Sequence, residues 1–213
     1  MRELNLEKTL TYYNANAWDF VQNTRSIEFK NIQNRFLAHL SPGGKILDFG
    51  CGSGRDTKYF LKQGYEVEAV DGSEEICRLA EAYTGIPVRR MWFLELDARN
   101  AYDGIWACAS ILHLKKGELP EMLKKLCRAL RRNGSLYTSF KYGDYEGERE
   151  GRYFTDLTEK AARELCRNVP GLEIEECWIT GDARAGRDEE QWLNLIWTKR
   201  DIDFQKQDGS FLQ

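Results

Sequence analysis

Short apolar runs alternate with amphipathic stretches along most of the chain. The runs at residues 45–49, 66–70, 88–93, 102–108 and 135–140 have the length of buried strands. Between them, residues 55–63, the segment after Ser73, and residues 118–132 and 158–167 place apolar side chains at helical spacing. Strands that alternate with helices are typical of β-α units, so the pattern predicts an α/β fold: a doubly wound, mostly parallel sheet with helices on both faces.

The last two apolar runs, residues 172–179 and 192–198, are joined by a polar loop and not by a helical stretch. A short polar connection favours antiparallel pairing. We therefore expect these strands to form a hairpin at one edge of the sheet. Together with the five strands above, they complete a seven-stranded sheet.

The segment before the first strand carries two helical patterns, at residues 8–22 and 26–40. The second pattern places Phe29, Ile32, Phe36 and Leu40 on one face. We expect residues 1–40 to be a helical cap or lid that forms a single domain with residues 41–200. Residues 201–213 are polar and are expected to be a frayed tail.

Composition narrows the class of protein. A formal net charge of −3 over 213 residues argues against a protein that wraps nucleic acid through clustered basic side chains. The chain has neither a signal-peptide pattern nor an apolar run of transmembrane length, so we expect a cytoplasmic protein without a membrane partner. The six cysteines form no C-x-x-C pair and there are only two histidines, so no metal is expected.

A glycine-rich loop, Gly-Cys-Gly-Ser-Gly at residues 50–54, connects the first strand to the following helix. Such a loop leaves backbone N–H groups free and lets a ligand approach closely. A dinucleotide fingerprint would need a glycine at position 55, where this chain has Arg55. The spacing therefore weakens the interpretation as a nicotinamide-binding loop.

Two acidic residues flank this loop. Asp48 lies in the strand itself, where a carboxylate needs a partner to offset its desolvation, and a cationic ligand would supply one, directly or through water. Asp71 follows Gly50 by about twenty positions at the end of the second strand, the place where an acid meets a ribose diol in such folds. A ligand with an ammonium group and a ribose fits both acids.

Residues 46–54 and 70–73 resemble the class I S-adenosylmethionine-dependent methyltransferases. The resemblance continues through residues 102–106, 109–113 and 128–130, and covers about residues 45–200. Within that class, Tyr12, Tyr13 and residues 65–67 are similar to tellurite-resistance-type and related small-molecule methyltransferases. The resemblance implies a Rossmann-like sheet, S-adenosylmethionine as cofactor, S-adenosylhomocysteine as product and a small-molecule methyl acceptor.

The cofactor is expected at the carboxyl ends of the first strands. The candidate cofactor-binding residues are Asp48, Gly50, Cys51, Gly52, Ser53, Gly54, Asp71, Gly72, Ser73, Trp92, Phe93 and Ala109. The third strand departs from the family pattern, because residues 91–94 (Met-Trp-Phe-Leu) replace the acid that often brackets adenine. We expect adenine to contact the flank of Trp92 and Phe93, which leaves the roles of Glu95 and Asp97 open.

The candidate catalytic residues are His113 and Tyr13. His113 follows the fourth strand, the position from which this fold presents residues toward the transferred methyl, and it or a tyrosine could position or deprotonate the acceptor. The alternatives are a structural histidine and simple core packing of the N-terminal aromatic residues. The candidate acceptor-binding residues are Tyr12, Trp18, Tyr142, Arg152 and Tyr153.

Two other functions remain open. An RNA methyltransferase acting on tRNA or rRNA is one, although the acidic balance and the absence of an Asn-Pro-Pro-aromatic box at residues 107–110 argue against a nucleic-acid partner. A non-catalytic S-adenosylmethionine-binding protein is the other. The acceptor atom cannot be inferred from the sequence, because specificity lies in variable loops. The chain is expected to be a monomer or a homodimer.

Overall fold

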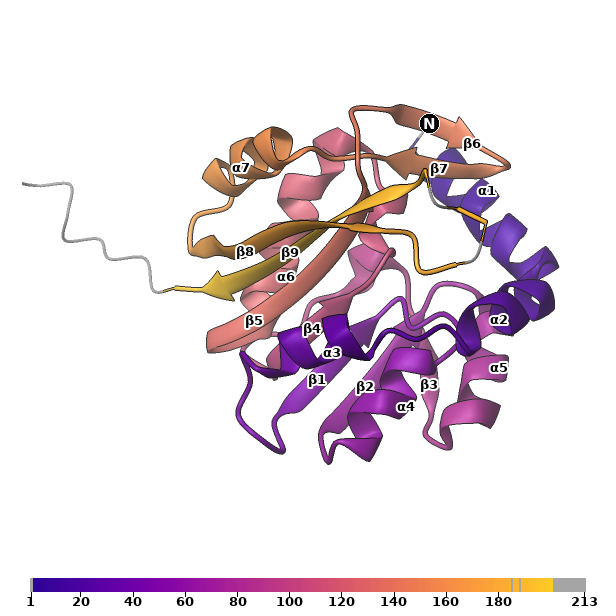
Figure 1. Ribbon diagram of the computed structural model, residues 1–213, viewed down its shortest axis with the longest axis horizontal. Coiled ribbons are helices and arrows are strands. Elements are labelled where there is room, and N and C mark those ends of the chain that lie inside the picture. The colour runs from indigo at the N-terminus through magenta and orange to yellow at the C-terminus, as the bar shows by residue number, and fades with distance from the viewer. Residues whose placement is uncertain (1, 185, 188, 201–213) are drawn as a thin grey trace, which may run out of the picture.

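The computed structural model describes residues 2–184, 186–187 and 189–200, with side chains from residue 6 onward. The main sheet is built from β1 (Lys45–Phe49), β2 (Glu66–Asp71), β3 (Val88–Arg90), β4 (Tyr102–Ala107), β5 (Leu130–Lys141), β8 (Leu172–Gly181) and β9 (Gln191–Lys199). The helices are α1 (Arg2–Ala15), α2 (Ala17–Arg25), α3 (Lys30–Leu37), α4 (Arg55–Lys62), α5 (Glu74–Thr84), α6 (Leu119–Ala129) and α7 (Glu159–Arg167). Figure 1 shows the arrangement.

The seven strands lie in the order β3-β2-β1-β4-β5-β9-β8. The first five strands along the chain pair in parallel, whereas β9 is antiparallel to both of its neighbours. This confirms the predicted doubly wound, mostly parallel sheet with an antiparallel hairpin at its edge. The parallel strands bring their carboxyl ends to one edge of the sheet, where ligands bind in this architecture.

Each face of the sheet is covered by helices. On one face, Phe36 of α3 and Phe60 of α4 pack against Trp106 and Tyr137 of the sheet, whose rings stack with centroids 4.0 Å apart. On the other face, α6 contributes a fully buried apolar stripe that includes Leu123 and Leu126. Because both faces are packed, the sheet holds the residues at its carboxyl edge in fixed positions.

The N-terminal helices differ from the two that the pattern predicts. The predicted helix at residues 8–22 is divided at Asn16, whose φ and ψ of −114° and 18° leave the helical region and whose Nδ2 donates to the Tyr12 carbonyl at 2.8 Å. The resulting helices α1 and α2 meet α5, and α1 also packs along β7. These helices therefore flank the carboxyl edge of the sheet.

Three further boundaries differ. Helix α6 ends at Ala129 and not at residue 132, because Leu130 already begins β5. The third strand stops at Arg90, and a short 3-10 turn (Phe93–Glu95) follows. The segment expected to be a loop after residue 140 contains a hairpin of β6 (Glu146–Arg149) and β7 (Arg152–Thr155). The expected tail at residues 201–213 lies outside the described residues.

No helix in the described part of the chain is long and apolar enough to cross a bilayer.

Candidate functional site

A cavity of about 580 Å³ opens at the carboxyl ends of β1, β2 and β4. Its walls come from these strand ends, from α1 and α2, from the β6–β7 hairpin and from the segment after β8. The candidate residues that line it are Tyr13, Gly50, Cys51, Gly52, Ser53, Asp71, Gly72, Trp92, Phe93, Ala109, His113 and Arg152. Residues far apart in the sequence thus share one enclosure of the size that small ligands occupy.

The glycine loop turns sharply away from β1. Gly50, Gly52 and Gly54 all have positive φ, at 86°, 54° and 75°, and the N–H groups of Gly50 and Cys51 both donate to the Val70 carbonyl at 2.9 Å. A Cβ on Gly50 would lie 2.5 Å from the Cβ of Ser110, and one on Gly54 would lie 2.7 Å from Thr84. Only glycine fits here, in conformation and in space.

Asp71 locks this loop to the end of β2. Its two carboxylate oxygens accept hydrogen bonds from the N–H groups of Gly52 and Ser73, each at 3.0 Å. Burial raises the pKa of this carboxyl, while these backbone bonds oppose the rise by favouring the charged form. The side chain of Ser73 caps α5, the helix predicted after it, by accepting from the Ile76 N–H. The two sequence motifs are therefore one structural unit.

Asp48 lies behind the loop and does not line the cavity. Its side chain is 1% exposed and accepts a hydrogen bond from Thr57 Oγ1 at 2.5 Å. Burial, reinforced by the nearby Asp56, raises the pKa of the Asp48 carboxyl to about 8. A direct contact between Asp48 and a ligand ammonium is therefore not available in this structure, since the loop stands between them.

Asp56 is a functional-site residue that the sequence reasoning missed. It lines the cavity floor and accepts hydrogen bonds from Gln33 at 2.6 Å, from Arg55 at 2.8 and 2.9 Å and from Trp106 at 2.9 Å. These donors come from α3, α4 and β4, so one buried carboxylate joins three elements below the glycine loop. Its position two residues after the glycine loop was the sequence signal that could have identified it.

The adenine end of the predicted site has an apolar wall. Trp92 and Phe93 line the cavity, and the Phe93 ring packs 5.3 Å from that of Phe49. The side chain of Glu95 is engaged locally, because it accepts from the Trp92 N–H at 2.7 Å and so closes the 3-10 turn. Glu95 therefore stabilises the turn that carries Trp92 and Phe93.

Tyr13 and His113 form a hydrogen-bonded pair inside the cavity. The Tyr13 hydroxyl lies 3.0 Å from His113 Nε2, and His113 Nδ1 lies 2.6 Å from the Tyr153 carbonyl oxygen. A carbonyl can only accept, so Nδ1 carries the proton and Nε2 accepts from the phenol. Burial lowers the pKa of His113 to about 4 and raises that of Tyr13. Both groups are neutral near pH 7.

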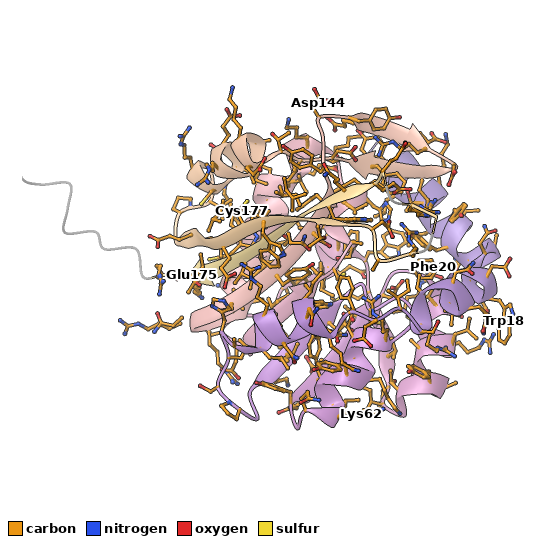
Figure 2. The ribbon with its side chains drawn as sticks, in the orientation of Figure 1. Trp18, Phe20, Lys62, Asp144, Glu175 and Cys177 are labelled. Atoms are coloured by element: carbon orange, nitrogen blue, oxygen red, sulfur yellow. The ribbon has the colours of Figure 1, made fainter. Side chains whose placement is uncertain are left out.

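Of the five predicted acceptor-binding residues, only Arg152 lines the cavity. Trp18 is 63% exposed and projects from the outer side of α2 (Figure 2). It is therefore not part of the proposed acceptor site. The hydroxyl of Tyr142 donates to Glu159, and that of Tyr153 to Glu146, both away from the cavity wall. Tyr12 supports the site indirectly, since its ring lies 4.3 Å beneath the Arg152 guanidinium.

Two polar atoms of the cavity wall are buried without a hydrogen-bond partner among the described residues, Ser110 Oγ and Arg152 Nε. Both atoms are enclosed by protein, so it is the other atoms of these two side chains that line the cavity. Ser110 stands against Gly50 at the loop, and Arg152 stands on the hairpin. Ser110 was not among the residues predicted from the sequence.

Comparison with known proteins agrees with this geometry. Residues 46–134 match a family described as a methyltransferase domain. A Bacillus subtilis protein named as a methyltransferase (YqeM) is 31% identical over 119 residues, which are 50% of this chain and 48% of that protein. The match thus spans about half the length of that relative.

Solved structures agree on the fold. A Burkholderia thailandensis 1,6-didemethyltoxoflavin N1-methyltransferase, with its acceptor and S-adenosylhomocysteine bound, superposes with a TM-score of 0.77 at 22% identity, over 94% of this chain and 91% of that one. A TehB-like S-adenosylmethionine-dependent methyltransferase from Corynebacterium glutamicum gives a TM-score of 0.66 at 21% identity, over 87% and 99%. The sheet thus has the fold of these methyltransferases, in agreement with the domain match.

Proposed function

We propose that this chain, whose residues 46–134 match a methyltransferase domain, transfers a methyl group from S-adenosylmethionine to a small-molecule acceptor. The observation that carries the proposal is the convergence of the Asp71-locked glycine loop and the Tyr13–His113 pair on one cavity. The first provides a place for the methyl donor. The second provides polar atoms for an acceptor beside it.

The residues present fit the cofactor. The glycine loop leaves no room for a Cβ at Gly50, and Gly50, Gly52 and Asp71 all line the cavity. In the proposal, the Asp71 carboxylate receives the ribose hydroxyls, and Trp92 and Phe93 cover the adenine ring. The sulfonium supplies an already activated methyl group.

The chain's own contribution is then positioning. Methyl transfer needs the acceptor atom in line with the donor at about 3 Å, and pre-oriented geometry supplies much of the rate. The Tyr13 hydroxyl donates a hydrogen bond to His113 Nε2 and interacts with the Arg152 guanidinium, and in the proposal its remaining lone pair accepts a hydrogen bond from an acceptor N–H or O–H. His113 in turn is held by the Tyr153 carbonyl, which fixes its tautomer.

The enclosure favours a small acceptor over RNA. Walls from α1, from α2 and from the β6–β7 hairpin surround the cavity, and together with α3 these N-terminal helices act in the proposal as the cap over the sheet domain. Binding of an RNA backbone would instead call for an open surface with clustered lysines and arginines. The polar pair at the acceptor end also argues against a protein that only binds the cofactor, since such a protein needs no acceptor site.

Two measurements test the proposal. Calorimetry with S-adenosylhomocysteine should show one binding site per chain. Transfer of a tritiated methyl group from S-adenosylmethionine should label a metabolite extract and not purified tRNA or rRNA. Label in RNA alone would reassign the acceptor to RNA, and binding without transfer to any acceptor would favour the non-catalytic alternative.

A further inference from the structure

The tip of the β6–β7 hairpin holds two arginines side by side. Arg149 and Arg152 are directly opposite each other in the antiparallel register, so their side chains lie on the same face, and both line the cavity. Glu150 and Gly151 make the two-residue turn between them, with φ values of 50° and 76°. Like charges placed directly opposite are destabilising unless something compensates them.

The two arginines are compensated to different extents. Arg149 makes a two-pronged ion pair with the buried Asp156, at 3.0 and 2.7 Å. Arg152 makes an ion pair of 3.0 Å with Glu150, whose side chain is 77% exposed, whereas that of Arg152 is 17% exposed; its guanidinium also interacts with the Tyr13 hydroxyl. A solvated carboxylate adds little to a pair. Among the described residues, Arg149 thus has a buried carboxylate partner and Arg152 only an exposed one, although the Arg152 side chain lines the cavity.

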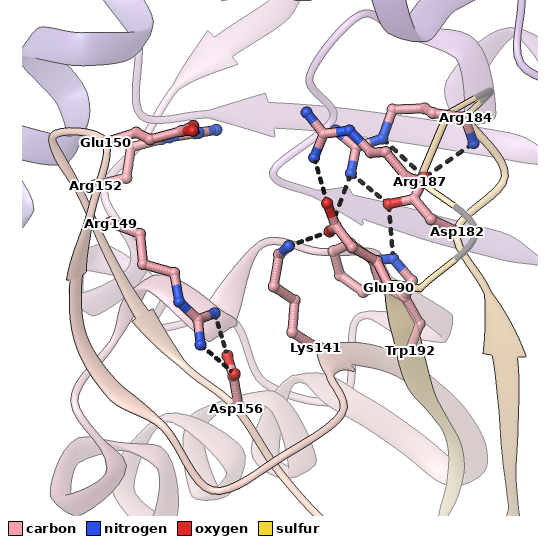
Figure 3. A network of polar contacts seen from close by, with 10 residues as sticks. All are labelled: Lys141, Arg149, Glu150, Arg152, Asp156, Asp182, Arg184, Arg187, Glu190 and Trp192. Carbon is pink, nitrogen blue, oxygen red and sulfur yellow. Dashed lines mark hydrogen bonds and ion pairs between the residues drawn. The ribbon is translucent and has the colours of Figure 1, made fainter.

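The surroundings of Arg152 are cationic as well. The Phe154 ring has Arg152, Arg149 and Lys141 around it at 5.3, 5.8 and 5.9 Å. In the network of Figure 3, five cationic side chains meet four carboxylates, which leaves one positive charge in excess. Each of the other cations in that network has as its partner a carboxylate side chain that is 31% exposed or less.

We propose that the methyl acceptor carries an anionic group, such as a carboxylate or a phosphate, and that Arg152 binds this group through its planar guanidinium. The inference rests on the proposed methyl transfer and adds the substrate class. Arginine is suited to this role because its parallel N–H donors match the two oxygens of such an anion. The Tyr13–His113 pair lies on the same side of the cavity, since the Arg152 guanidinium is 5.9 Å from the Tyr13 ring. An acceptor anchored at Arg152 can therefore reach the Tyr13 hydroxyl.

The test separates acceptors by charge before the reaction. A metabolite extract is divided by ion exchange into an anionic fraction and a neutral-plus-cationic fraction, and each is incubated with the full chain and tritiated S-adenosylmethionine. We expect label transfer from the anionic fraction. Arg152→Gln should lower that initial rate by about 30-fold through loss of charge-assisted bonds, Arg152→Lys should recover part of it, and S-adenosylhomocysteine affinity should stay unchanged in both. Arg78→Gln, an exposed arginine on α5, is the matched control.

Three results would overturn the inference. They are label transfer from the neutral-plus-cationic fraction alone, an unchanged rate for Arg152→Gln, and weakened S-adenosylhomocysteine binding by Arg152→Gln, which would assign the guanidinium to the carboxylate of the cofactor. The first two leave the proposed methyl transfer intact. Cofactor binding with no transfer from either fraction would instead defeat the proposed function, and the acceptor class with it.

Discussion

The hydroxyl of Tyr13 lies 3.0 Å from Nε2 of His113, although one hundred positions separate the two residues in the chain. Helix α1 supplies the tyrosine, and the turn after β4 supplies the histidine. The hairpin completes the arrangement, because the Tyr153 carbonyl holds the other imidazole nitrogen at 2.6 Å. Three segments must therefore be docked before this polar pair exists.

Replacing Tyr13 with phenylalanine should impair turnover and spare cofactor binding. The ring and its packing remain, but the hydroxyl that orients the acceptor is lost, and we expect kcat to fall about 100-fold. Steady-state kinetics together with calorimetry on S-adenosylhomocysteine check this. Tyr12→Phe is the matched control and should leave kcat within about twofold, because the Tyr12 ring beneath Arg152 is retained. Equal losses in both variants would refute a specific role for the Tyr13 hydroxyl.

His113 should remain uncharged down to a pH of about 4 in the folded protein. Its pKa is lowered from 6.5 to about 4, chiefly by burial. Between these values the unfolded chain binds a proton that the folded chain does not, so stability is lost as pH falls from 6.5 to 4. The loss should approach about 3 kcal/mol. Urea unfolding at pH 7.0, 5.5 and 4.5 measures it.

The control for this pH effect is His113→Gln. The unfolding free energy of that variant should depend less on pH across the same window, and the difference from the wild type isolates the histidine. An NMR titration of the His39→Gln variant, which leaves His113 as the one histidine, reads the pKa directly. A midpoint near 6.5 would contradict the burial argument.

Gly50→Ala should abolish cofactor binding, whereas Gly64→Ala should not. Both glycines have almost the same φ, 86° and 85°, so both variants carry the cost of a left-handed alanine, about 1–2 kcal/mol. The Cβ at position 50 would also meet Ser110 at 2.5 Å, while nothing lies within 4 Å of one at position 64. Calorimetry on folded samples, with thermal unfolding to compare stabilities, distinguishes the two. Similar cofactor affinities in both would argue against the loop as the binding site.

Asp71→Asn should weaken S-adenosylhomocysteine binding by about 10- to 100-fold. The amide can accept only one of the two backbone N–H bonds from Gly52 and Ser73, and bonds to a charged group contribute about 1.5–3 kcal/mol. Isothermal calorimetry gives the dissociation constant. The exposed Asp144, which Figure 2 places at the surface, provides the control substitution Asp144→Asn. Unchanged affinity in Asp71→Asn would remove this carboxylate from the site.

Asp56→Asn should destabilise the fold by about 3 kcal/mol, since it leaves Arg55 in a buried position without its charge partner. Glu75→Gln removes the partner of Arg78 in an exposed pair and should cost at most about 0.5 kcal/mol. Urea denaturation of the two variants measures both values. A small effect of Asp56→Asn would mean that the four-donor cluster is not a significant support of the loop.

Much of the fold could be predicted because its signals are local. The apolar runs and glycine turns set the strands and the loop, and Ser73 capped α5 where the pattern placed it. Predictions based on one boundary residue were less successful. The helix expected over residues 118–132 stops short of its predicted end, and Asn133 has a φ of 59° inside β5, because Leu130 pairs with Tyr102 and draws the chain into the sheet.

The candidate site likewise contains residues that local sequence signals predict and residues that they do not. The glycine loop, Asp71, Tyr13 and His113 were identified from residue type and position. The hairpin tip was not, since a stretch rich in charged and aromatic residues carries no strand pattern of its own. Nor could the sequence show that Trp18 faces solvent while Arg152 faces the cavity, because that depends on how α1 and α2 dock.

The sequence by itself determined the seven strands of the main sheet, the helices between them, the glycine loop and the class of ligand, because these follow from spacing within about thirty residues. Only the tertiary structure decided which polar groups meet. It buried Asp48 behind the loop, paired Tyr13 with His113 and placed Arg152 in the cavity wall. The physical reason is that burial and pairing are properties of surfaces brought together by packing, and no local pattern encodes them.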